Sequence, residues 1–73
     1  MKPIATRTLL KLLRQYNCIA GDTEGSHQKW TAPRGRSTSV KIDVKEQAPG
    51  TLRNIQRHLE PDLGPRWLEK ELK

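Results

Sequence analysis

The sequence predicts a small α+β domain in which two helices cover one face of a three-stranded antiparallel sheet. Apolar residues recur with helical spacing over residues 6–16. Three short strand-like runs follow between residues 18 and 44, and Pro49 opens a second helical stretch. Tight connections between the runs favour an antiparallel meander. The order helix, three strands, helix therefore favours a two-layer domain with one open sheet face.

The first helix is expected over residues 6–16, with Thr6 as its N-cap and Asn17 after its end. The basic residues Arg7, Lys11 and Arg14 fall on the side opposite the apolar face. That face is assigned to the core and consists of Leu9, Leu10, Leu12, Leu13 and Tyr16. A membrane-surface helix is the alternative, but the segment is short and leads into strands.

A weak strand over residues 18–23, a turn at Gly25 and a stronger strand over residues 26–32 come next. Alternation along the stronger strand places Trp30 on one face and His27 with Lys29 on the other. If Trp30 packs in the core, His27 and Lys29 share the open face.

The segment Pro33-Arg34-Gly35-Arg36 is predicted to be a turn. A third strand over residues 37–44 should point Val40, Ile42 and Val44 toward the core. Lys41 then lies on or near the open face, with His27 and Lys29.

The second helix is expected to run from Pro49 to about His58 and to be broken by the segment Glu60-Pro61-Asp62-Leu63-Gly64-Pro65. Its core side would consist of Leu52, Ile55 and Leu59, and its solvent side of Arg53 and Arg57.

A short third helix over residues 66–72 would carry the apolar Trp67, Leu68 and Leu72. We divide the chain into a domain of residues 1–60 and a C-terminal extension of residues 61–73. The apolar patch of the extension should pack on the first helix or be bound by a partner.

Length and composition limit the possible classes of protein. A chain of 73 residues forms one small domain with a thin core. The single cysteine, Cys18, cannot form an intramolecular disulfide, which indicates a reducing compartment, so we expect a cytoplasmic protein. Basic residues interrupt the N-terminal apolar segment, so neither a signal peptide nor a membrane span is expected. One cysteine and two histidines argue against a zinc site, and no cofactor is expected.

Positive charge is concentrated in the first 58 residues. The net charge is +6, and residues 1–58 hold 11 basic and 4 acidic side chains. Such a balance indicates an anionic partner, most often a phosphate backbone. An acidic protein is the other partner class, and both can apply to one chain.

Three motifs follow one another along the chain: Leu9-Leu10-Lys11-Leu12-Leu13, then Gly25-Ser26-His27 with an aromatic at Trp30, then Pro49-Gly50-Thr51-Leu52-Arg53-Asn54-Ile55. Each motif alone is weak. In this order and spacing, over roughly residues 4–59, they resemble the HicA-type toxins, the small mRNA interferases of toxin–antitoxin pairs.

The resemblance implies a double-stranded-RNA-binding-like fold and cleavage of mRNA by the histidine of the Gly-Ser-His motif, here His27. It also implies inhibition by a HicB-type antitoxin that covers the site, with any DNA association only through that antitoxin. The motif-supporting positions are Gly25, Ser26, Gly50 and Thr51. Two positions depart from the family's pattern. Glu24 stands where a basic residue is common, and Lys41-Ile42-Asp43 stands where many members have Pro-His-Pro.

His27 is therefore the candidate catalytic residue of a metal-independent endoribonuclease. An imidazole can remove the proton from a ribose 2′-hydroxyl, whose oxygen then attacks the adjacent phosphorus. Lys29 would balance the charge that develops on the phosphorane. Further candidates for RNA backbone contacts are Arg34, Arg36, Lys41 and Arg53. The alternative is a non-catalytic RNA-binding module on the same fold, in which His27 only contacts phosphate.

Four other residues have a structural and a functional interpretation. Trp30 could stack on a base, but alternation with His27 favours the core. Glu24 could be a catalytic carboxylate, but a solvated turn charge is the simpler interpretation. His58 is interpreted as a surface or partly buried helix residue, and Cys18 as a small core hydrophobe.

Overall fold

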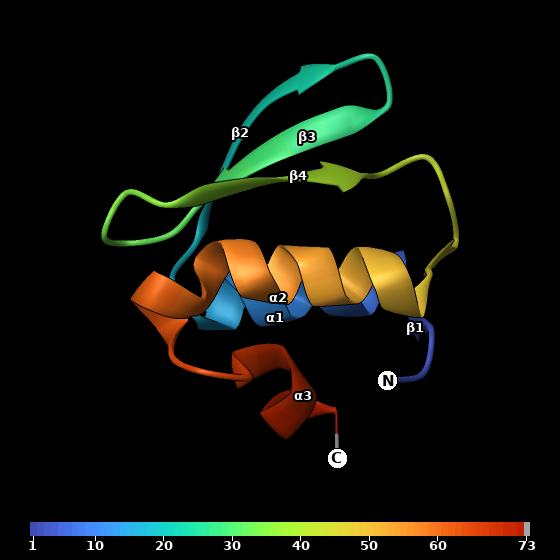
Figure 1. Ribbon diagram of the computed structural model, residues 1–73. Coiled ribbons are helices and arrows are strands. Elements are labelled where there is room, and N and C mark those ends of the chain that lie inside the picture. The colour runs from blue at the N-terminus through green and yellow to red at the C-terminus, as the bar shows by residue number, and fades with distance from the viewer. Residues whose placement is uncertain (73) are drawn as a thin grey trace.

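The structure is a computed structural model that describes residues 1–72 of the chain. A three-stranded antiparallel sheet lies over the helices α1 and α2, and the short helix α3 lies beneath them (Figure 1). The elements are β1 (Ile4–Ala5), α1 (Thr6–Gln15), β2 (Ile19–Glu24), β3 (His27–Thr31), β4 (Ser37–Lys41), β5 (Glu46–Gln47), α2 (Pro49–Leu63) and α3 (Trp67–Glu71). Within residues 1–72, no helix has both the length and the apolar character needed to cross a bilayer.

Helix α1 has the expected apolar face, with Leu9 and Leu13 fully buried. Asn17 ends it with a φ of 65°, a left-handed conformation that asparagine tolerates better than most residues. The N–H groups of Asn17 and Cys18 donate to the carbonyls of Arg14 and Leu13, each at 2.9 Å. These two bonds satisfy carbonyl groups that the end of a helix otherwise leaves unpaired.

The prediction that Thr6 caps α1 is wrong. Ala5 occupies the N-cap position, and no side chain caps the helix there. The Thr6 hydroxyl instead donates to the carbonyl of Val44 at 2.6 Å and accepts from the Gln47 amide at 2.9 Å. This buried network joins the start of α1 to the segment that follows β4.

The short pair of β1 and β5 was not expected from the sequence. Ile4 lies opposite Gln47 and Ala5 opposite Glu46 in an antiparallel register. Strands of two residues are too short to show alternation, so only the folded chain reveals this pair.

The expected meander is confirmed, because β2, β3 and β4 are neighbours in that order and pair antiparallel. The first two strands lie within one residue of their expected bounds, but β4 ends at Lys41 and not at Val44. Beyond Lys41 the chain turns toward α1, and the Ile42 N–H donates to the Ser26 carbonyl at 2.8 Å. Ile42 still packs against the core, and Val44 is partly buried, so the apolar alternation outlasts the strand.

Helix α2 begins at Pro49, as predicted, but continues through Pro61 to Leu63. The expected end at about His58 is therefore wrong, but the break expected within residues 60–65 is confirmed. Pro61 lies in the last turn, where the Gly64 N–H still donates to the Glu60 carbonyl at 2.9 Å. The helix ends at Gly64, whose φ of 104° suits glycine. The boundary expected after residue 60 therefore falls inside α2.

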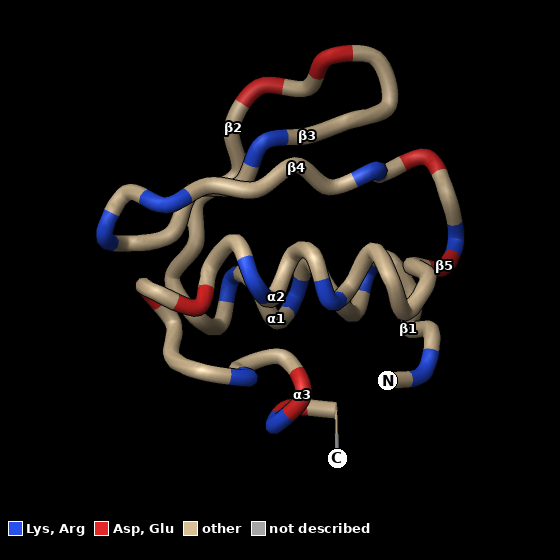
Figure 2. Tube along the Cα trace, in the orientation of Figure 1, with Lys and Arg blue, Asp and Glu red and all other residues tan. Residues whose placement is uncertain are grey.

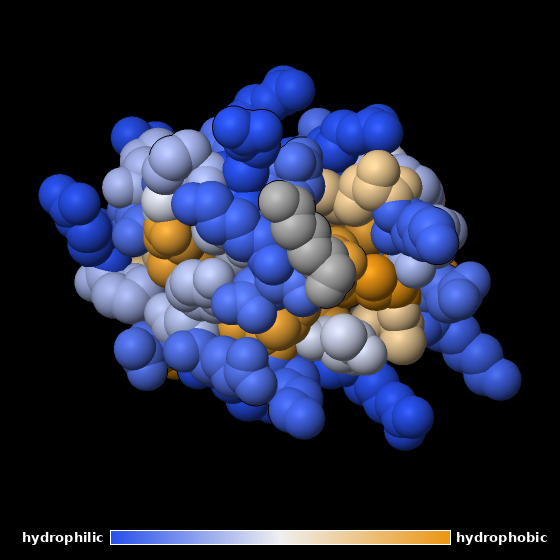
Figure 3. All heavy atoms as spheres, turned by 90° about the horizontal axis from the view of Figure 1, so that it is seen from below, coloured by the Kyte–Doolittle hydropathy of each residue, from blue (hydrophilic) through white to orange (hydrophobic). Residues whose placement is uncertain are grey.

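Helix α3 belongs to the same core as the rest of the chain. Trp67 is 1% exposed, and its indole N–H donates to the Gln56 carbonyl at 3.1 Å. The ring meets Tyr16 edge-on, with a centroid separation of 5.2 Å. Residues 67–71 therefore add a third layer to the expected two, and the apolar patch of the tail packs within the chain. Seen from below, the helical side is largely hydrophilic, with hydrophobic atoms between the charged side chains (Figure 3).

Candidate functional site

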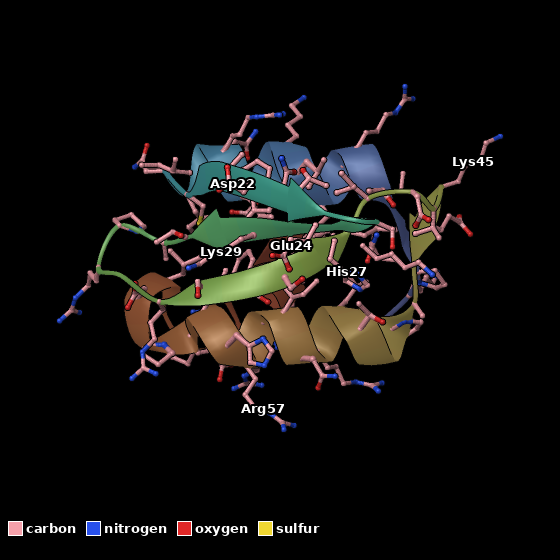
Figure 4. All side chains as sticks on the ribbon, turned by 90° about the horizontal axis from the view of Figure 1, so that it is seen from above. Asp22, Glu24, His27, Lys29, Lys45 and Arg57 are labelled. Atoms are coloured by element: carbon pink, nitrogen blue, oxygen red, sulfur yellow. The ribbon has the colours of Figure 1, made fainter. Side chains whose placement is uncertain are left out.

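The sheet surface turned away from α1 and α2 is called the open face here. His27 and Lys29 are exposed on it, whereas Trp30 is 1% exposed on the opposite side of the same strand (Figure 4). The predicted division of β3 into two faces is confirmed. Trp30 lies in the core, with the Arg14 guanidinium 5.5 Å from its ring centroid, so the ring does not offer a face to a base.

A two-residue turn, Gly25-Ser26, joins β2 to β3 and fixes where His27 starts. Gly25 has a φ of 59°, a conformation that favours glycine at the first central position of such a hairpin. The Ser26 carbonyl accepts the N–H of Ile42. Both residues therefore support the backbone around His27, and the chemistry of the site falls to the strand residues.

His27 lies in the middle of a row across three strands. Glu24 of β2 is opposite it on one side, and Lys41 of β4 is opposite it on the other. Directly opposed residues have Cβ atoms about 4.5–5.5 Å apart and share one face of the sheet. The Gln47 amide also donates to the Lys41 carbonyl at 2.7 Å, which ties this end of β4 to the buried Thr6 network.

The charge count led us to expect a basic open face, but the face carries charges of both signs. Asp22 and Glu24 project from β2, whereas Lys29 and Lys41 belong to β3 and β4 (Figures 2 and 4). Glu24 thus flanks His27 on the β2 side and Lys41 flanks it on the β4 side, while Asp22 lies in the irregular stretch of β2 opposite Lys29. Glu24 directly precedes the two-residue turn and His27 directly follows it, so the hairpin places the two residues opposite each other.

The other predicted RNA contacts are spread over the molecule. Arg34 and Arg36 lie in the β3–β4 turn, at the end of the sheet away from His27 (Figure 1). Their backbone N–H groups both donate to the Asp62 carboxylate, at 3.1 Å each, which fixes the turn to α2. Arg53 is exposed on α2 in the helical layer.

The motif positions Gly50 and Thr51 are exposed in the first turn of α2. A Cβ added to Gly50 would meet nothing within 4 Å, so packing does not explain a glycine there. The structure therefore groups His27, Lys29 and Lys41, with Gly25 and Ser26 in the adjoining turn. It leaves the other predicted residues elsewhere: Arg34, Arg36, Gly50, Thr51 and Arg53.

His58 lies beside the open face, a position that the sequence did not indicate. It is exposed on α2, as expected, and its Nδ1 atom lies 3.0 Å from the Thr38 hydroxyl of β4. A shallow hollow at this edge of the sheet is lined by Lys29, Ser37, Thr38, Ser39 and His58. No local sequence pattern links residues 38 and 58, since only the docking of α2 against β4 brings them together.

A larger hollow, of about 780 Å³, lies between the first turn of α1 and residues 42–46. Leu10, Ile42 and Val44 contribute apolar side chains to its lining. None of the predicted site residues lines it.

Two titratable side chains have raised pKa values. Burial, followed by the charge of Asp62, raises the pKa of the Cys18 thiol. Burial, followed by the hydrogen bond to Glu71 and the charge of Glu71, raises the pKa of Tyr16. Both side chains stay neutral near neutral pH, so Cys18 is a core residue, as predicted, and not a nucleophile.

Among residues 1–72, no three or more His, Cys, Asp and Glu side chains form a group that could hold a metal ion. The sequence matches no protein-family model, and neither the curated proteins nor the solved structures give a match. The side chains of the open face and its β4 edge are therefore the features from which a function can be inferred.

Proposed function

We propose that the chain is a metal-independent endoribonuclease, the toxin of a type II toxin–antitoxin pair, in which His27 cleaves mRNA. The observation that carries this proposal is the exposure of His27 on the central strand, with Lys41 opposite it and Lys29 on the same face. The helix, three-strand, helix order supports the double-stranded-RNA-binding-like fold that the HicA resemblance implies. The proposed place of action is the cytoplasm.

In the proposed reaction the His27 imidazole takes the proton from a ribose 2′-hydroxyl. The freed oxygen bonds to the adjacent phosphorus, and the bond from phosphorus to the 5′-oxygen breaks. The leaving oxygen takes up a proton, from the imidazolium or from water. The ammonium group of Lys41, opposite His27, lies on the face where the phosphorane would carry its extra charge, and Lys29 lies two residues further along β3 on the same face. The products are a 2′,3′-cyclic phosphate and a 5′-hydroxyl.

Replacing His27 by alanine tests this chemistry. We expect His27→Ala to lose at least about 100-fold in cleavage rate, as removal of a general base typically does, without loss of fold, because the side chain is exposed. Lys11→Ala is a suitable control, because it removes an exposed positive charge from α1. Cleavage assays on mRNA, with analysis of the product ends and a chelator present, give the readout.

The outcomes separate the two functions under consideration. Unchanged cleavage by a folded His27→Ala protein would remove His27 from the mechanism, and 3′-hydroxyl ends would contradict attack by the 2′-oxygen. RNA binding without any cleavage by the wild-type chain would instead favour a non-catalytic RNA-binding module.

A further inference from the structure

The hollow at the β4 edge, here called the edge hollow, is lined by Lys29, Ser37, Thr38, Ser39 and His58. It combines side chains of the open face with one from α2. Each side chain in this lining carries a group that can donate a hydrogen bond, and none is a carboxylate. Such a set suits an anion that accepts several hydrogen bonds.

Thr38 fixes how His58 meets the hollow. The Thr38 hydroxyl lies 3.0 Å from Nδ1 of His58, and Thr38 itself is 5% exposed on the buried side of β4. When the hydroxyl donates to Nδ1, the other ring nitrogen, Nε2, carries the proton. His58 then faces the hollow as a hydrogen-bond donor.

The position of the hollow relates it to His27. Lys29 follows His27 by two residues on β3, and Ser39 precedes Lys41 by two residues on β4. Two residues along a strand span about 7 Å, a step that one nucleotide of an extended RNA strand can bridge. On the β2 side of the face, Glu24 opposite His27 and Asp22 in the irregular stretch opposite Lys29 would repel a phosphate backbone.

We propose that the edge hollow binds a phosphate of the RNA strand, next to the scissile phosphate, which is attacked by the 2′-oxygen that His27 deprotonates. The strand then runs from His27 across β3 and β4 toward α2, away from the acidic side chains of β2. Lys29 supplies the charge, Ser37 and Ser39 supply hydroxyl donors, and His58 supplies a donor held in place by Thr38. This site rests on the proposed function, since it orients the substrate of that reaction.

Binding measurements test the site. The ligand is an intact RNA with a sequence that the protein cleaves, in which the attacking 2′-hydroxyl is methylated to prevent cleavage. We expect His58→Ala to weaken binding about three- to tenfold, with a smaller loss for Thr38→Val. Lys29→Gln should also lower the slope of log K against log salt by about 0.7, the value for one contact on single-stranded nucleic acid. Lys11→Gln, on α1, is the control for lost charge. Thermal melting checks that each variant is folded.

A scan that replaces one phosphate at a time by an uncharged methylphosphonate identifies the ligand. In the wild-type protein, neutralising the phosphate beside the scissile one should weaken binding. In His58→Ala the same replacement should have a smaller effect, because the contact is already lost.

Three results would overturn the proposal. Unchanged affinity of His58→Ala would show that the ring does not meet RNA. Weaker binding with an unchanged phosphate scan would mean that His58 contacts a base. In both cases cleavage dependent on His27 would leave the proposed function intact, whereas a wild-type protein that neither binds nor cleaves RNA would overturn both.

Discussion

Glu24 lies opposite His27 across the β2–β3 hairpin, so a carboxylate and an imidazole share one face of the sheet. In the proposed function this carboxylate stands beside the point where a phosphate must bind. Two like charges at about 4 Å repel by about 1 kcal/mol in water, and salt weakens the repulsion at exposed sites. Glu24 is thus expected to limit RNA affinity and to direct the strand toward β4.

Replacing Glu24 by glutamine removes the charge and keeps the shape. We expect Glu24→Gln to bind RNA about two- to fivefold more tightly at low salt, with a smaller gain at high salt. Glu46→Gln on β5 is the matched control, because it removes an exposed carboxylate outside the open face. Titrations at several salt concentrations give the affinities. Equal gains from both variants would show that net charge, and not the place of Glu24, sets the affinity.

At the scale of single residues, alternation alone placed His27 and Lys29 on the open face and Trp30 in the core. Alternation alone could not place Glu24, because the residue opposite it depends on the length of the turn and on strand register. His58 could not be placed from sequence at all, since its contact with Thr38 depends on how α2 docks against β4.

Among the elements, α3 shows how a short segment can matter to the whole core. Trp67 and Leu68 are buried, and the Tyr16 hydroxyl donates to Glu71 at 2.8 Å. The amide of Gln56 holds α3 to α2, because its oxygen accepts the Glu69 N–H at 2.8 Å. A chain cut at residue 60 would lose this layer as well as the last turn of α2.

The variant Trp67→Ala tests the contribution of α3. We expect it to lower the free energy of unfolding by about 3–5 kcal/mol, as for other buried aromatic residues. A loss of that size can unfold a domain of this length. Because Trp67→Phe keeps a ring beside Tyr16, its stability should lie between those of Trp67→Ala and the wild type. Lys70→Ala, exposed on the same helix, should change stability by less than about 0.5 kcal/mol. Urea unfolding provides the measurement, and a wild-type-like Trp67→Ala protein would contradict the role of α3.

The elements that the sequence predicted well have long or regular patterns. Helix α1 and the meander of β2, β3 and β4 show clear periods. The failures have local causes. The two residues of β1 are too few to show a pattern, the alternation of Ile42 and Val44 continues after β4 has ended, and Pro61 is tolerated in the final turn of α2.

For the whole molecule, the mixed charge of the open face changes the expected partner. The charge count favoured a simple acidic inhibitor. Since β2 carries Asp22 and Glu24, an inhibitor that covers the face needs acidic groups over Lys29 and Lys41 and neutral or basic groups over β2. The tail is already packed in the core, so the partner has no need to bind Trp67.

Hydrogen exchange with and without the proposed antitoxin checks this arrangement. We expect slower exchange in residues 24–31 and along β4, and little change in α3, which lies on the far side of the helices (Figure 1). If the antitoxin blocked cleavage without protecting residues 24–31, occlusion of His27 would be excluded and inhibition would act from a distance.

The two tryptophans are intrinsic fluorescent probes of how the core is packed. Trp30 lies between the sheet and the helices, Trp67 lies against α2 and Tyr16, and each is 1% exposed. Neither indole reaches the open face, so RNA bound there should leave the blue emission of buried rings in place. A red shift of the emission would show that water has entered one of the two interfaces in which the tryptophans lie. Intrinsic fluorescence can therefore distinguish a variant that has lost its ligand from one that has lost its fold.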